Sequence, residues 1–363
     1  MIPAQIYVYV YTLVLGFVAL LYYNKLTGRS AIYLIEKHIT NKSSVAILFV
    51  IIALFIGERP ISGIFTDMLG YSDMYDANIL TDHNDIGIWW LASICNEFGF
   101  GSSVWFTLIS FIYFGAYLKA SNNISSNSSA LIFITFLTAF STFSYATNTI
   151  RSGMSTSLAA VGISYYILEG RKNKFIACLL FLGSILTHKS STLPIVCFIV
   201  SYYKVNFKMS MYFWLLSILI SLTVGNALST IFENLGFDDR MDQYLQATDM
   251  TGFAHVGFRW DFLLYSMMPI LLAFYIIIKR GIRDKIYETL ISTYVLANAF
   301  WVMIIRAQFS DRFAYLSWFL YPIVLVYPLL RLDVWGISQG NIAKKILWCH
   351  LGFTLFMVFI FYA

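Results

Sequence analysis

Long, uninterrupted apolar runs restrict this 363-residue sequence to a small set of folds. Only 12% of its residues are charged, 59% are hydrophobic, and the mean hydropathy is +0.72. Soluble domains carry about 25% charged residues, so the composition indicates a protein that crosses a membrane several times. The runs are continuous, whereas a β-barrel would show short alternating segments. The sequence therefore predicts an all-α, polytopic integral membrane protein.

The apolar runs predict about 12 transmembrane helices, at roughly 20 residues for each span. The first run lacks a basic segment before it and a small-residue cleavage site, so we expect a retained span and not a removable signal peptide. We expect residues 1–363 to form a single transmembrane domain. The expected spans cover residues 5–23, 45–57, 102–119, 130–147, 152–168, 175–188, 190–203, 211–228, 261–278, 286–305, 313–330 and 346–362.

Lysine and arginine are divided unevenly between the connecting loops, and this division predicts the orientation. Alternate loops hold all but seven of the 24 basic residues, so we place these loops in the cytoplasm. The opposite loops then face outward, and the two longest are residues 58–101 and 229–260. Six of the seven outward basic residues are arginines, which hold phosphate and carboxylate groups bidentately. The seven are Arg59, Arg151, Lys189, Arg240, Arg259, Arg306 and Arg312.

Arg151 is an isolated cation between two expected spans, in the segment "ATNTIRSGMS". One interpretation is an arginine that reaches the membrane surface or donates to helix carbonyls. The other is a charge that faces a water-filled cavity and awaits an anionic ligand, because ionisable groups at membrane depth usually mark substrate paths. No countercharge lies nearby in the sequence, so we favour the second interpretation.

The outward segment from Glu58 to Trp90 combines carboxylates with aromatic rings. It is either a solvated acidic loop or a sugar-binding surface, since sugar hydroxyls need acceptors and their apolar faces stack on aromatic rings. Residues 86–100 are apolar at helical spacing, which predicts a helix lying along the membrane surface. The acidic residues of this segment are Glu58, Asp67, Asp73, Asp76, Asp82 and Asp85, with Tyr71, Tyr75 and His83 beside them.

Three further outward connections carry cations. His188 and Lys189 follow one span, and His188 is among the few side chains here that exchange a proton near neutral pH. A lone histidine at a span end is also often just hydrogen-bonded. One later connection places Arg259 and Asp261 at the membrane boundary. The other holds Arg306, Asp311 and Arg312, either with an arginine–aspartate pair that closes a hairpin or with one arginine left over for a ligand.

Together these connections predict an outward-facing cavity with a cationic floor and an acidic, aromatic roof. A ligand with a phosphate group near the membrane surface and sugars beyond it would match both. The four cysteines form no CxxC pattern, and no HExxH motif occurs, so we expect no metal site, no disulfide framework and no cofactor. Nucleic acid is not an expected partner.

The motifs, taken in order, resemble the Wzy and EpsG-like families of bacterial polysaccharide polymerases. The resemblance rests on Arg59 followed by "DMLGY", on "NTIRSGMSTSLAAVGISYYILEGRKNKFIACLLFLGSILTHKSSTLPI", on "GFRWDFLLY", and on the late R-x-x-x-x-x-R-x-x-Y segment. It covers most of the chain. Ser152 departs from the pattern, because many relatives carry glutamine after the arginine, and this weakens assignment to a particular subfamily.

The resemblance implies a GT-C-like membrane glycosyltransferase without a metal, acting on the periplasmic side of the bacterial inner membrane. It would transfer a growing glycan from undecaprenyl diphosphate onto a new lipid-linked repeat unit, with inversion. Its expected partners are the lipid-linked donor and acceptor, membrane lipid and a chain-length regulator. Catalytic roles are expected for His188 and Asp67, and substrate contacts for Arg59, Tyr71, Arg151, Lys189, Arg259, Arg306 and Arg312.

Other functions fit the same features. A flippase for lipid-linked oligosaccharides would also need outward cations, although transporters of that kind usually show internal repeats and charges on both faces. A ligase that moves finished glycan onto another lipid, and an acyltransferase with an essential histidine, remain alternatives. The polar interruptions favour one side of this chain, which favours an enzyme.

Overall fold

The computed structural model describes residues 2–26, 42–79, 85–126, 128–234, 258–306 and 311–362. Within these residues all regular secondary structure is helical, which confirms the all-α, polytopic prediction. Six of the described helical segments are long and apolar enough to cross a membrane: Ala4–Tyr23, Ser102–Ile124, Phe207–Gly225, Trp260–Lys279, Asp311–Arg331 and Gly336–Phe361. The total of about 12 spans stays a prediction.

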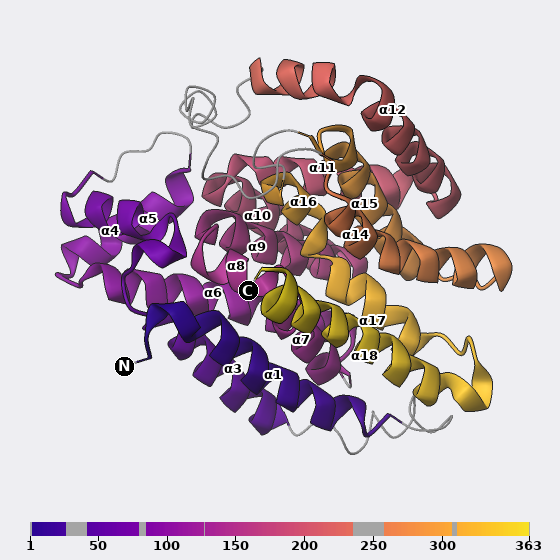
Figure 1. Cartoon of the computed structure of the whole chain (residues 1–363), viewed down its shortest axis with the longest axis horizontal. Helices are drawn as coiled ribbons and strands as arrows, with labels where there is room; N and C mark the ends of the chain where they lie inside the picture. The colour runs from indigo at the N-terminus through magenta and orange to yellow at the C-terminus, as the bar shows by residue number, and fades with distance from the viewer. Residues whose placement is uncertain are drawn as a thin grey trace. The chain divides into compact units, whose positions relative to one another are not determined.

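The chain folds into two compact units, which are described separately. The first contains residues 1–191 and 325–363, and the second contains residues 192–324. The helices of the first unit, shown in Figure 1, are α1 (Tyr7–Tyr23), α3 (Lys42–Gly57), α4 (Met68–Asp76), α5 (Ile86–Glu97), α6 (Ser102–Ile124), α7 (Ser129–Leu137), α8 (Thr142–Thr147), α9 (Ile150–Ile167), α10 (Arg171–Thr187) and α18 (Gln339–Phe356). Its shorter helical turns are η1 (Ala4–Ile6), η2 (Gly63–Phe65), η3 (Lys189–Ser191), η6 (Gly336–Ser338) and η7 (Met357–Phe361).

The helices of the second unit are α11 (Thr192–Tyr203), α12 (Phe207–Asn234), α14 (Trp260–Ala273), η5 (Phe274–Lys279), α15 (Lys285–Met303) and α16 (Asp311–Trp318). α17 (Tyr321–Arg331) begins in the second unit and ends in the first. Each predicted span coincides with one of these helices or with two consecutive ones. The expected span 130–147 is divided into α7 and α8, and the expected span 313–330 into α16 and α17.

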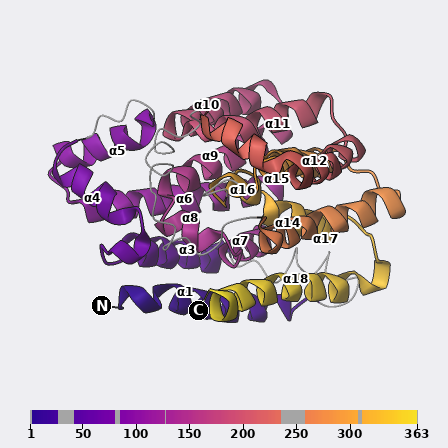
Figure 2. The ribbon, with the colours of Figure 1, turned by 45° about the horizontal axis from the view of Figure 1, so that its top comes forward.

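Side-chain hydrogen bonds account for the break between α7 and α8. The Thr142 hydroxyl donates to the carbonyl of Phe136 at 2.5 Å, and the Tyr11 hydroxyl donates to that of Leu137 at 2.8 Å. Thr354, on α18, donates to the carbonyl of Thr138 at 2.9 Å. A broken helix survives among apolar helices only where its carbonyls find other donors. α1 and α18, which run alongside each other in Figure 2, supply two of the three.

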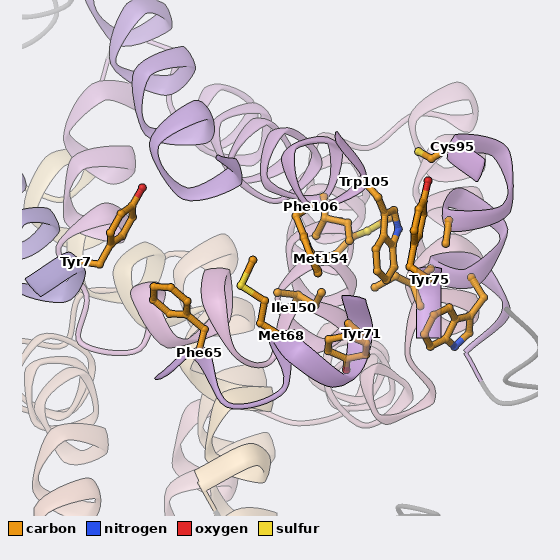
Figure 3. Close-up of a cluster of buried hydrophobic side chains, with 14 residues drawn as sticks. Tyr7, Phe65, Met68, Tyr71, Tyr75, Cys95, Trp105, Phe106, Ile150 and Met154 are labelled. Atoms are coloured by element: carbon orange, nitrogen blue, oxygen red, sulfur yellow. The ribbon is translucent and has the colours of Figure 1, made fainter. Parts of the chain in front are cut away.

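An aromatic cluster packs α4 and α5 against α6 within the first unit (Figure 3). Trp105, on α6, stacks on Tyr75 of α4 with ring centroids 5.4 Å apart, and on Trp89 of α5 at 5.7 Å. Ile150 and Met154 of α9 belong to the same buried cluster. The helix predicted at residues 86–100 corresponds to α5, which follows α4. The buried face of α5, which carries Trp89, packs into this cluster. Burial of large aromatic side chains is among the strongest packing contributions available to two short helices.

The core of the second unit contains a buried polar network centred on Asn298 of α15. Its side-chain oxygen accepts from the Trp214 indole at 2.8 Å, and its amide donates to the hydroxyls of Ser266 and Ser317 at 3.0 Å. The Trp318 indole donates to the same Ser266 hydroxyl at 2.8 Å. One amide thus connects α12, α14 and α16 to α15.

Replacing Asn298 by alanine is expected to destabilise the protein by roughly 1–3 kcal/mol, because it leaves a buried indole N–H and two hydroxyls short of a partner. Ser292→Ala is the matched control on the same helix: its buried hydroxyl has no hydrogen-bond partner among the described residues. Unfolding in detergent, followed by circular dichroism, compares the two. Equal decreases in stability for the two variants would show that the hydrogen-bond network contributes nothing beyond the volume of the side chain.

Candidate functional site

Arg151 is the second residue of α9, and its side chain is buried and paired. The residue is only 8% exposed, and Nη1 donates to Oδ2 of Asp85 in a buried ion pair. Its guanidinium also lies 5.7 Å from the centroid of the Tyr71 ring, within cation–π range. The countercharge that the local sequence lacks is supplied by the residue before α5, 66 positions earlier.

Asp85 accepts hydrogen bonds from three separate groups. Besides Arg151, the imidazole of His188 reaches it, with Nδ1 lying 3.1 Å from Oδ2 and 3.2 Å from Oδ1. The backbone N–H of Lys189 is the third donor. Burial alone would raise the pKa of this carboxyl, but His188, Arg151 and the Lys189 N–H together hold its pKa below the usual value. Asp85 is therefore a carboxylate at neutral pH although it is only 3% exposed.

His188 and Lys189 lie where α10 ends. His188 has extended backbone, with φ −161° and ψ 118°, so the chain leaves the helix there and turns into η3. This turn directs the imidazole toward Asp85 and leaves the Lys189 side chain exposed. His188 and Arg151 are thus connected through a shared carboxylate.

Gly87 allows α5 to approach α10 closely enough for these contacts. A Cβ atom added at this position would lie 3.1 Å from both the backbone nitrogen and Oγ1 of Thr187, and 3.2 Å from the carbonyl carbon of Leu186. Two of these three atoms are backbone atoms and cannot move aside by rotation. Since Asp85 lies two residues before Gly87 and His188 one residue after Thr187, the contact sets the separation of the carboxylate and the imidazole.

Arg59 lies in the same unit and is 3% exposed. It donates to the carbonyl of Ile56 at 2.7 Å and to that of Thr147 at 3.1 Å. Its guanidinium also packs over the rings of Phe65 and Phe106. Burial lowers the pKa of Arg59 to about 10, so it stays charged at neutral pH. These contacts tie the end of α3 to the end of α8, and a role for Arg59 in substrate binding stays a prediction.

Asp67 precedes α4 and lies one helical turn before Tyr71, so the two share one face of the helix. Tyr71 is 2% exposed and packs its ring against Trp89 and Trp105, with centroids 6.1 and 6.3 Å away. Figure 3 shows Tyr71 at the edge of the cluster, near Ile150. Asp67 and Tyr71 are thereby carried to the same side of the unit as the start of α9.

The second unit gathers the three late arginines around α14 and α16. Arg259 forms a bidentate pair with Asp261, at 2.9 Å from Nε to Oδ1 and 2.6 Å from Nη2 to Oδ2. The charges of Arg312 and Arg259 both act on Asp311. Arg306 donates to the carbonyl of Ser221 at 3.3 Å. The contact of Arg259 with Asp261 is therefore an ion pair, and the role of the arginines near Asp311 stays a prediction.

A model of the EpsG family matches residues 43–363. The chain belongs to the EpsG family. No curated protein and no solved structure matches it. Membership agrees with the resemblance that the arginine motifs indicate, and it supports a role of the polysaccharide polymerase type in a membrane protein.

The sequence of this EpsG-family chain predicts site residues at Arg151, His188, Lys189 and Tyr71, and the structure brings these four together. The sequence alone did not single out Asp85 or Gly87. Asp85 is one of six carboxylates in an acidic segment, and only its place directly before an apolar helix could have distinguished it. Asp82, His83 and Arg240 lie outside the described residues.

The arrangement combines a fixed cation, an ionised carboxylate and a group that can take up a proton. The guanidinium of Arg151 is held against Asp85, and an imidazole such as that of His188 can both accept and donate a proton. A buried charge with a specific partner is typical of functional sites. Burying charges is unfavourable, and apolar side chains would pack the same space with less loss of stability.

Gly87→Ala is expected to destabilise the EpsG-family protein by about 1–2 kcal/mol, because the added methyl group meets the backbone of α10. Gly183→Ala, on α10 itself, is the matched control: an added Cβ there meets no atom within 4 Å. That substitution should raise stability by about 0.5–1 kcal/mol through helix propensity. Unfolding midpoints in detergent measure both, and a gain for Gly87→Ala would contradict the close approach.

Proposed function

We propose that this EpsG-family protein is a polysaccharide polymerase that joins oligosaccharide repeat units carried on undecaprenyl diphosphate, at the periplasmic face of the inner membrane. The observation that carries the proposal is the meeting of Arg151 and His188 at Asp85. A glycosyl transfer from a lipid diphosphate needs positive charge at the leaving group and a base at the attacking hydroxyl. One buried cluster supplies both.

In the proposed step, an acceptor sugar hydroxyl attacks the anomeric carbon of the donor glycan. The hydroxyl proton passes to His188, the new glycosidic bond forms, and the bond from the anomeric carbon to the diphosphate oxygen breaks. The undecaprenyl diphosphate leaves with one additional negative charge, and the configuration at the anomeric carbon is inverted. The proton on His188 is then released to water, so atoms and charge balance.

Arg151 stabilises the diphosphate in this proposal. Its charge and hydrogen-bond donors would act where negative charge develops, which is the largest catalytic term in many enzymes. Asp67 is assigned to the acceptor, because a carboxylate accepts hydrogen bonds from sugar hydroxyls. The Tyr71 ring is 2% exposed and packs against the Arg151 guanidinium, and its contact with substrate stays a prediction. Asp67 is the alternative base. Substrate contacts of the exposed Lys189, and of Arg259, Arg306 and Arg312 in the second unit, stay predictions.

Deletion of the gene tests the proposed function directly. Cells without a polymerase should display single repeat units on a glycan gel in place of a ladder of chain lengths. An unaltered ladder would overturn the proposal. Loss of the single-unit band as well would instead favour a flippase or a ligase.

Arg151→Lys is expected to reduce polymer formation about 100-fold or more, because lysine keeps the charge but loses the planar fork of donors. Arg171→Lys is the matched control, an exposed arginine at the start of α10 on the predicted cytoplasmic side. Complementation of the deletion strain, with membrane levels of each variant measured by immunoblot, gives the result. Full activity of Arg151→Lys would show that the fork is not required.

A further inference from the structure

We propose that Asp85 is a positioning residue that holds His188 in the tautomer with hydrogen on Nδ1, so that Nε2 presents the lone pair that accepts the proton. The use of that lone pair as the proton acceptor rests on the proposed function. The assignment of the tautomer itself rests on the contacts of Asp85 alone.

Two of the three partners of Asp85 can only donate hydrogen bonds. An arginine guanidinium and a backbone N–H have no acceptor atom, so the carboxyl faces them as an acceptor. Both also favour the ionised form, since hydrogen bonds to a carboxylate stabilise its charge. The Asp85 carboxyl therefore carries no proton of its own with which to meet the imidazole.

His188, in contrast, can either donate or accept a hydrogen bond through its ring nitrogens. Its Nδ1 atom, which lies 3.1 and 3.2 Å from the two carboxylate oxygens, must carry hydrogen to make a favourable contact there. In neutral imidazole the other nitrogen, Nε2, is then without hydrogen. When Nε2 takes up a proton, the imidazolium that forms lies against the buried carboxylate and is stabilised by it. Asp85 itself stays ionised, because Arg151 and Lys189 still donate to it.

Asp85→Asn keeps the shape of the side chain and tests the tautomer. Arg151 can only donate, so it should retain the amide oxygen of asparagine at the Oδ2 position and leave the NH₂ group at the Oδ1 position, which lies 3.2 Å from Nδ1 in the wild type. An N–H group at that position favours Nδ1 as an acceptor, which places the hydrogen on Nε2 and removes the lone pair of Nε2. We expect polymer formation to fall about 100-fold or more in this variant.

The deciding measurement is solid-state ¹⁵N NMR of protein labelled with ¹⁵N-histidine and embedded in lipid nanodiscs. The His188 signals are assigned by comparison with His188→Gln, and the pH is raised until the spectrum stops changing, so that the imidazole is neutral. The wild type should show protonated Nδ1 and unprotonated Nε2, and Asp85→Asn should show the reverse. Glu169→Gln, which removes a carboxylate from an exposed residue of the same unit, should keep the wild-type spectrum.

The spectrum and the polymer assay separate the two proposals. Protonated Nε2 in the wild type, or an unchanged spectrum in Asp85→Asn, would overturn the role of Asp85. The expected spectra together with a full polymer ladder in His188→Gln would leave the tautomer assignment standing and overturn the use of His188 as the base. A general loss of structure in Asp85→Asn would shift many histidine signals, whereas a tautomer change moves those of His188 alone.

Discussion

The buried ion pair of Arg151 and Asp85 organises the first unit. Leaving a buried charge without its partner costs about 3–5 kcal/mol, so Arg151 and Asp85 depend on each other. Asp85 reaches Arg151 where α5 lies against the end of α10, and the absence of a side chain at Gly87 allows that close approach. The contact therefore couples the outward segment, the α9 hairpin and the histidine connection into one structure.

The aromatic cluster stabilises the helices that bring Arg151 and Asp85 into contact. Tyr71, Trp89 and Trp105 attach α4 and α5 to α6, while Ile150 and Met154 bring the first turns of α9 into the same cluster. Arg151, in the first turn of α9, is thus held against this packed core. A rigid hydrophobic support next to a charged cluster is what holds catalytic groups within a fraction of an ångström.

Much of this fold could be predicted from sequence, because apolar runs are a strong signal when the solvent is a membrane. Each predicted span coincides with a helix or a helix pair, and Arg151, His188 and Tyr71 were singled out for their residue type and position. The break after Leu137 was missed, since the donors that satisfy it come from Tyr11 and Thr354, far away in the sequence. Asp85 was missed for the same reason: its importance follows from contacts 66 and 103 residues distant, which no local pattern records.

A carboxylate next to the proposed diphosphate site would repel the ligand unless nearby cations outweigh its charge. Arg151 and Lys189 carry two positive charges, and Asp85 carries one negative charge, so the set is cationic while His188 is neutral. Under the proposed function the hydroxyl proton moves to His188 during transfer, and the set gains a further positive charge. The leaving diphosphate gains a negative charge in the same step. Because Asp85 stays ionised throughout, the added charge resides on the imidazolium beside it, and the electrostatic stabilisation of the leaving group grows as the reaction proceeds.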